Sequence, residues 1–169
     1  MQTILSQTVD EIYACHILEH FGRGQIVNVL AEWNRVMKMG STLRIAVPDF
    51  ESSVKWYLEH PTGLNQLTGL LHGGQGNSHD YHYLSFDFFL LSRLLNLCGF
   101  TQVERYDANT FLPAGFDDYS LSYKPHKDVR GTLMSLNVRA TKVRHVSSGA
   151  EVERNAFLSQ LIGAKLLGK

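Results

Sequence analysis

Three ionisable side chains follow directly after the first hydrophobic segment of the chain. Residues 9–15 are largely apolar and predict a buried strand, and His16, Glu19 and His20 come immediately after it. Open α/β sheets bind their ligands in the crevice at the carboxyl ends of the strands. We therefore expect a functional site that begins at His16.

The spacing of these residues also matches the H-x-x-E-H pattern of inverted zinc peptidases. In those enzymes two histidines one helical turn apart bind the metal, and the glutamate acts as a base. Both histidines must then share one exposed helical face, whereas His16 is predicted to close a strand. We therefore expect no metal and keep the peptidase only as an alternative. For Glu19 and His20, a further alternative to a direct role is an exposed first helical turn.

A second cluster of polar side chains lies in segment 72–82, which is too rich in glycine to be a strand or a helix. Its notable residues are His72, Gly73, Gly74, Gln75, Gly76, His79, Asp80 and His82. The segment lacks the lysine and hydroxyl of a phosphate-binding P-loop, and its irregular histidine spacing defines no coordination geometry. An exposed glycine loop without a binding role is the alternative interpretation.

Strands and helices alternate along the chain, which is typical of the α/β class. Apolar residues recur at helical spacing over 26–37, and Gly40 stands where such a helix would stop. A strand over 42–48 then completes a right-handed crossover with a parallel pair. Asp49 is predicted to cap the next helix, which ends at His60-Pro61 because a residue before proline avoids the helical region.

The later elements are predicted from apolar periodicity and turn residues. They are a short helix over 64–71, a helix over 86–97 capped by Ser85, a strand over 100–106, a long connection over 108–130, a strand over 132–143 and a helix over 150–167. The strand over 132–143 could pair antiparallel with its neighbour. Trp33, Trp56 and the aromatic residues over 86–89 are expected in the core.

The composition favours one globular domain of the cytoplasm. The chain has 169 residues, of which 44% are hydrophobic, and this is enough for one core. Lysine plus arginine and aspartate plus glutamate number 16 each, so no net charge favours nucleic acid. No apolar segment is long enough to predict a membrane span. Cys15 and Cys98 fit free thiols in a reducing compartment better than a disulfide.

Six stretches of the sequence resemble class I S-adenosylmethionine-dependent methyltransferases, in particular the predicted methyltransferases found among bacterial surface-polysaccharide genes. In chain order they are DEIYACHILEHF, LAEWNRVMKMG, TLRIAVPDF, HGGQGNSHDYH, LSRLLNLCGF and SLNVRATK. The resemblance implies part of a Rossmann-like sheet, mostly parallel with an antiparallel last strand and with helices on both faces. We expect a truncated methyltransferase-like domain over 1–145 and an amphipathic helix within 146–169.

The resemblance also implies which residues form the site. The cofactor S-adenosylmethionine would contact Ala14, Cys15, His16, Glu19 and His20. The acceptor-side loop would use Asp49, Gly73, Gly74, Gln75, Asp80 and His82. Methyl transfer depends mainly on positioning, so no catalytic residue is assigned, and His16 or His82 is expected at most to assist as a base.

Two features depart from the family pattern. Met39 and Ser41 stand where the family usually has proline and glycine. The family's first three strands and its glycine-rich cofactor loop would precede Val9, where only eight residues stand. The resemblance therefore implies impaired cofactor binding by this chain alone, with a small molecule or saccharide as methyl acceptor. A non-catalytic interaction module derived from a methyltransferase is the alternative.

The lack of counterparts for the family's first three strands also predicts that this chain associates with a second copy or with a partner chain. In the family the strand matching 9–15 lies at the centre of the sheet, so here it would become an edge with unpaired backbone groups. We expect a homodimer, or a partner chain, to cover this strand, with the helix over 150–167 contributing to the interface.

Overall fold

The computed structural model describes residues 4–60 and 63–146, and its centre is a mixed four-stranded sheet. The strands are β1 (Val9–Cys15), β2 (Met37–Pro48), β6 (Ser135–Lys142) and β3 (Phe100–Arg105), in that spatial order. β1 and β2 are parallel, whereas β6 is antiparallel to both of its neighbours, β2 and β3. The predicted α/β class, the mostly parallel sheet and the antiparallel last strand are confirmed.

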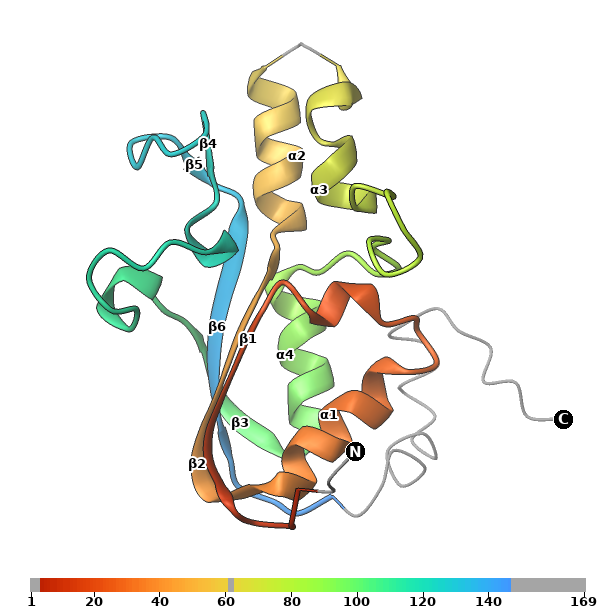
Figure 1. Cartoon of the computed structure of the whole chain (residues 1–169), viewed down its shortest axis with the longest axis vertical. Coiled ribbons are helices and arrows are strands. Elements are labelled where there is room, and N and C mark those ends of the chain that lie inside the picture. Colours follow the sequence, from red (N-terminus) through yellow and green to blue (C-terminus); the bar gives the residue numbers. More distant parts are fainter. Residues whose placement is uncertain (1–3, 61–62, 147–169) are drawn as a thin grey trace, which may run out of the picture.

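Two α-helices, α1 (Ile26–Val36) and α4 (Phe88–Leu97), pack on one face of this sheet (Figure 1). The core lies between them and the strands, where Leu30, Leu94 and Ile45 are fully buried. The opposite face carries only the short 3-10 helices η3 (Ala108–Thr110) and η4 (Tyr119–Leu121) among the described residues. Helices are thus present on both faces, as expected, but the α-helices pack on one face and only short 3-10 helices lie on the other.

The elements around the carboxyl ends of β1 and β2 are short, apart from α2. They are η1 (Leu18–His20), α2 (Phe50–Glu59), η2 (Leu64–Gln66), α3 (Thr68–His72) and the two-stranded ribbon of β4 (Tyr123–Lys124) and β5 (Thr132–Leu133). α2 and α3 project beyond the sheet side by side (Figure 1) and pack through Trp56 and Leu67. None of the described helices is long and apolar enough to cross a membrane.

The cap of α2 agrees with the prediction from the sequence. The Asp49 carboxylate accepts hydrogen bonds from the backbone N–H groups of Glu51 and Ser52, which would otherwise lack partners at the helix start. The helix ends at Glu59, directly before His60. The predicted strand over 132–143 is interrupted at Met134 and forms β5 and β6.

Two predicted helix boundaries are wrong. Gly40 does not stop α1, which ends at Val36, but lies inside β2 with φ +79. It occupies an irregular part of the β1–β2 pairing, where the register shifts and glycine tolerates the left-handed backbone. Ser85 does not cap α4, because the Asp87 carboxylate accepts from the N–H of Leu90 at 2.7 Å and the helix begins later.

A buried asparagine joins the ends of α1, α4 and β6. The Asn34 amide nitrogen donates to the carbonyl oxygens of Cys98 (2.9 Å) and Arg144 (2.8 Å). Its amide oxygen accepts from the N–H of Val146 at 3.0 Å. Asn34 is fully buried, and its contacts with Cys98 and Val146 are buried as well, so water does not readily replace its side chain there.

A buried lysine completes the same junction. The Lys142 ammonium donates to the carbonyl oxygens of Asn34 (2.6 Å) and Met37 (2.7 Å), where the C-terminal end of α1 favours a cation. Burial lowers the pKa of Lys142.

We expect Asn34→Ala to lower the free energy of unfolding by about 2–4 kcal/mol, because it removes the side-chain partner of two buried backbone groups, at Cys98 and Val146, and a third hydrogen bond to the partly buried carbonyl of Arg144. Urea unfolding monitored by circular dichroism measures this value. Asn28→Ala on the exposed face of the same helix is the matched control and should change stability by less than about 0.5 kcal/mol. Equal losses for the two variants would contradict the assigned role of Asn34.

The homodimer remains a prediction. Among the described residues β1 is the last strand on its side of the sheet, with β2 as its neighbour. The exposed charges of β1 are engaged within the chain, Asp10 with Lys38 and Glu11 with Arg44. The predicted helix over 150–167 lies outside the described residues.

We expect light scattering on the whole chain to give the mass of a dimer, because an edge strand offers its free backbone groups to a second copy. A variant that ends at Val146 should dimerise more weakly if the following segment contributes to the interface. A whole chain that stays monomeric at about 100 µM, a concentration that would populate a micromolar dimer, would contradict the prediction.

Candidate functional site

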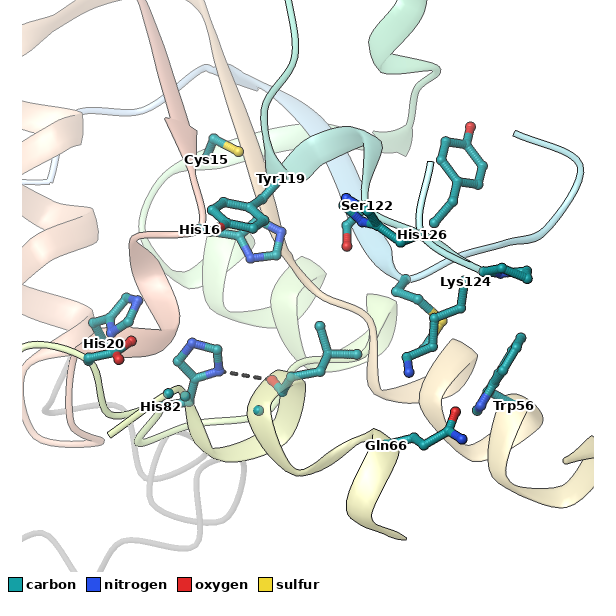
Figure 2. Close-up of a pocket in the computed structure, with 18 residues that line it drawn as sticks. Cys15, His16, His20, Trp56, Gln66, His82, Tyr119, Ser122, Lys124 and His126 are labelled. Atoms are coloured by element: carbon teal, nitrogen blue, oxygen red, sulfur yellow. Dashed lines mark hydrogen bonds between the residues drawn. The ribbon is translucent and has the colours of Figure 1, made fainter. Parts of the chain in front are cut away.

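A cleft of about 1010 Å³ opens at the carboxyl ends of β1 and β2 (Figure 2). One wall is formed by the end of β1 and η1, and a second by α2, α3 and the loop after α3. A third wall is the segment 119–126 with Met134. The volume suits a small organic ligand.

His16 turns the chain at the end of β1. Its φ of +50 is rare for a residue with a side chain, and its N–H is held by the carbonyl oxygen of Ala46 at 2.8 Å. Its Nε2 lies 3.2 Å from the hydroxyl of Ser135, which itself donates to the side-chain oxygen of Asn137. A hydroxyl that donates its proton to Asn137 accepts from His16, so Nε2 of His16 carries a hydrogen.

Glu19 lies behind His16 and is fully buried. Its Oε1 is 3.2 Å from Nδ1 of His16 and 4.0 Å from Nε2 of His82. The His16 contact is not aligned for a hydrogen bond, and neither carboxylate oxygen accepts one from any described residue. Burying an ionised carboxylate without hydrogen bonds costs free energy, so a group that compensates the charge of Glu19 is expected nearby.

The loop after α3 brings a second histidine to this carboxylate. Nδ1 of His82 lies 2.9 Å from the carbonyl oxygen of Leu70, and Nδ1 of His20 lies 3.1 Å from that of Tyr81. The two rings meet edge to face with centroids 4.8 Å apart. Burial lowers the pKa of His82, which favours its neutral imidazole. The two polar clusters that the sequence presents separately therefore form one group.

The glycines of the loop make room for Asp80. A Cβ at Gly73 would lie 2.1 Å from the Asp80 carbonyl oxygen, and one at Gly74 would lie 2.5 Å from its carboxylate. That carboxylate accepts from the N–H of Gly76, and the carbonyl accepts from the N–H of Gln75. The loop is thus folded on Asp80, and its glycines serve close packing rather than phosphate binding.

The structure places the predicted site residues in three groups. Those that line the cleft are Cys15, His16, His20, Gly73, Gly74, Asp80 and His82. Ala14 and Glu19 are buried behind its wall, and Gln75 lies outside it with its side chain on the His72 carbonyl. Asp49 also lies outside, where it caps α2 and pairs with Arg105 at 3.0 Å. Asp49 and Gln75 are therefore not part of the cleft wall.

Several cleft residues were not predicted from the sequence. Trp56 is buried in a small core cluster, as expected, but its ring also lines the cleft, stacks on His60 with centroids 3.7 Å apart and faces the Lys124 ammonium at 5.5 Å. Tyr119 and Lys124 come from the long connection over 108–130, whose length was its only functional signal. Phe89, also expected in the core, is 63% exposed.

The cleft does not have the geometry of an inverted zinc peptidase. His16 precedes η1 with a left-handed backbone, and η1 spans only Leu18–His20. The two histidines of the H-x-x-E-H stretch therefore do not stand one turn apart on a helix.

Cys15 lines the cleft but is a poor nucleophile. Burial raises the pKa of its thiol to about 11, so the thiolate is scarce near neutral pH. The neighbouring Tyr13 hydroxyl donates to the Asp118 carboxylate at 2.6 Å, and burial raises the pKa of this tyrosine as well. These groups do not support covalent catalysis by Cys15.

No protein-family model and no curated protein sequence matches the chain. Solved structures similar to it include a SAM-dependent methyltransferase from Archaeoglobus fulgidus, with 18% identity and a TM-score of 0.47 over 83% of this chain and 62% of that one. Human N-acetylserotonin methyltransferase in complex with SAM has 13% identity and a TM-score of 0.48, over 80% of this chain and 30% of that one.

A third similar structure is the Burkholderia thailandensis 1,6-didemethyltoxoflavin-N1-methyltransferase, with bound 1,6-didemethyltoxoflavin and S-adenosylhomocysteine. It has 14% identity and a TM-score of 0.45, over 82% of this chain and 46% of that one. The chain therefore spans less than two thirds of the length of each of these proteins. Similarity at this level does not establish a shared activity.

We expect Cys15 to react with iodoacetamide far more slowly than an ordinary thiol at about pH 8, because its raised pKa leaves little thiolate. Mass spectrometry of digested samples separates Cys15 from Cys98, whose pKa burial raises to about 12. Both should react at the ordinary rate in denaturant, which is the control. Alkylation of native Cys15 as fast as in denaturant would contradict the assignment.

Proposed function

We propose that the cleft belongs to a methyltransferase site that uses S-adenosylmethionine, with a small molecule or a saccharide as methyl acceptor. The main support is the position of the cleft at the carboxyl ends of the parallel strands β1 and β2, where such sheets bind their ligands. Cys15, His16 and His20, which the sequence resemblance assigns to the cofactor, line this cleft.

The side chains of the cleft suit positioning rather than covalent catalysis. S-adenosylmethionine, when bound, supplies an activated methyl group to an oxygen or nitrogen of the acceptor. Trp56, Leu70 and Tyr119 offer apolar surface that orients an acceptor and excludes water. Of the two candidate bases, His82 has an Nε2 without a hydrogen that could take up the proton of an acceptor hydroxyl, whereas Nε2 of His16 donates to Ser135.

The cleft fits only one side of the cofactor. A methyltransferase of this class holds the cofactor ribose with an acidic side chain, as the sequence resemblance implies. Asp80 is the one acidic residue among the described residues that line the cleft, and its carboxylate is already bonded to its own loop. We therefore propose that this chain alone binds the cofactor weakly and that another chain completes the site.

A non-catalytic interaction module is the second candidate, and a separate surface favours it. Four apolar side chains of α2 and the start of α4 form an exposed groove, with exposed fractions of 42–74%. They are Phe50, Val54, Leu58 and Phe89. Exposed apolar patches of this kind mark surfaces that contact other proteins.

Calorimetric titration with S-adenosylhomocysteine should give a dissociation constant weaker than about 100 µM, because part of the cofactor's polar contacts is missing. Fluorescence locates the binding, since Trp56 lines the cleft and Trp33 packs in the core. The ligand should quench a Trp33→Phe variant, which retains Trp56, and leave the matched Trp56→Phe variant unchanged.

A low-micromolar isotherm would contradict the incomplete cofactor site. If millimolar ligand neither binds nor quenches Trp56, the methyltransferase proposal is wrong and the interaction module is favoured.

A further inference from the structure

We propose that Glu19, His20 and His82 bind one divalent transition-metal ion of the zinc type at the inner wall of the cleft. One donor atom from each residue lies within 4.8 Å of the other two. Glu19 and His20 come from η1, whereas His82 comes from the loop after α3. The site therefore differs from the H-x-x-E-H peptidase pattern, which would use His16 in place of His82.

The first argument is the state of the Glu19 carboxylate. It is fully buried, and neither of its oxygens receives a hydrogen bond from the described residues. Burying an ionised carboxylate without compensation costs several kcal/mol, and such groups are normally paired or coordinate a metal. A cation at this point would remove the cost.

The second argument is the orientation of the two imidazoles. Nδ1 of His82 and Nδ1 of His20 each contact a backbone carbonyl oxygen, from Leu70 and Tyr81, and a carbonyl only accepts. Each Nδ1 therefore carries a hydrogen, and each Nε2 of the neutral ring has a free lone pair. Metal-binding histidines are held in the same way, with the second ring nitrogen donating to a carbonyl or carboxylate.

The third argument is the contact between these groups. Nε2 of His82 lies 4.0 Å from Oε1 of Glu19, so a lone pair faces a carboxylate with no hydrogen between them. Two such acceptors repel each other unless a cation lies between them. His16 does not resolve this in its neutral form, because its hydrogen is on Nε2 toward Ser135 and its Nδ1 also faces Glu19.

The donor set defines the class of ion. Two imidazole nitrogens and one carboxylate oxygen suit Zn²⁺ or Co²⁺, whereas Mg²⁺ prefers oxygen ligands alone. Bonds of about 2.0–2.2 Å in a tetrahedral site place the donors about 3.4 Å apart, so binding would draw the side chains together by roughly 1 Å. His20 and His82 line the cleft, so the remaining coordination position would face it.

The ion assigns separate roles to the neighbouring histidines. With His82 as a ligand, its Nε2 is not available as a proton-accepting base in the cleft. His16 lies on the other side of Glu19, with its Nδ1 3.2 Å from the carboxylate, and is not a ligand of the proposed ion. The metal site does not depend on the proposed methyl transfer, since its ligands and geometry stand without a cofactor.

The test is metal titration of the whole chain after treatment with a chelator. We expect one equivalent of Zn²⁺ by calorimetry and, with Co²⁺, the intense visible absorption of a low-coordinate site. Zn²⁺ should also raise the melting temperature, because it binds only the folded chain. Mg²⁺ should give neither heat nor stabilisation.

Four histidine variants test the two proposed histidine ligands. His82→Ala and His20→Ala should each weaken Zn²⁺ binding at least about 100-fold and remove the stabilisation, while His16→Ala, which removes no ligand, should weaken it less than about 10-fold. The matched control is His79→Ala, an exposed histidine of the same loop, which should bind like the unchanged chain. Circular dichroism without metal establishes that each variant is folded.

Three results would overturn the proposal. One is the absence of saturable binding at one equivalent. Another is a loss of binding in His79→Ala as large as in His82→Ala, which would indicate that exposed histidines bind the ion instead of the proposed site. The third is full binding in Glu19→Gln together with a higher melting temperature without metal, which would mean that Glu19 shares a proton with its histidines instead of binding an ion.

Discussion

The structure of the site depends on one buried carboxylate. Glu19 lies where the end of β1, η1 and the loop after α3 meet, and three imidazoles surround it without donating an aligned hydrogen bond. The backbone fixes this junction as well, because the N–H of Tyr83 donates to the carbonyl oxygen of Glu19 at 2.8 Å. Glu19 thus holds the loop after α3 through its backbone carbonyl and places a carboxylate at the base of the cleft through its side chain.

The sheet explains why this carboxylate is buried rather than exposed. The chain turns at His16, which has a left-handed backbone, and runs into η1, which packs against β2. The imidazole of His16 then reaches Ser135 at the start of β6, which is adjacent to β2 because the last strand is inserted antiparallel. The site therefore joins residues that are more than 100 positions apart in the sequence.

Much of the fold could be predicted, because local rules determine it. A largely apolar stretch predicted β1, the apolar residues over 42–48 predicted the second half of β2, and Asp49 and Pro61 predicted both ends of α2. The errors occurred where two local signals competed. Gly40 has the left-handed conformation of a helix stop but uses it inside a strand, and Asp87 caps α4 although Ser85 stands two residues earlier.

The site was predictable only in part, since its main feature is a long-range contact. The sequence indicated His16, Glu19 and His20 by their position after a strand, and indicated His82 separately by its glycine-rich loop. It gave no information on the tautomers or on the burial of Glu19, which depend on the carbonyls of Leu70 and Tyr81. The expectation that no metal binds rested on spacing along the chain, which does not describe a site assembled from two segments.

The most direct test of this account is a nitrogen NMR spectrum of isotope-labelled histidine rings in the metal-free chain. The account predicts that His20 and His82 carry their hydrogen on Nδ1, with an unprotonated Nε2 that shifts when Zn²⁺ is added. A hydrogen on Nε2 of His82, unchanged by Zn²⁺, would contradict it, because that hydrogen would satisfy Glu19 without a metal ion.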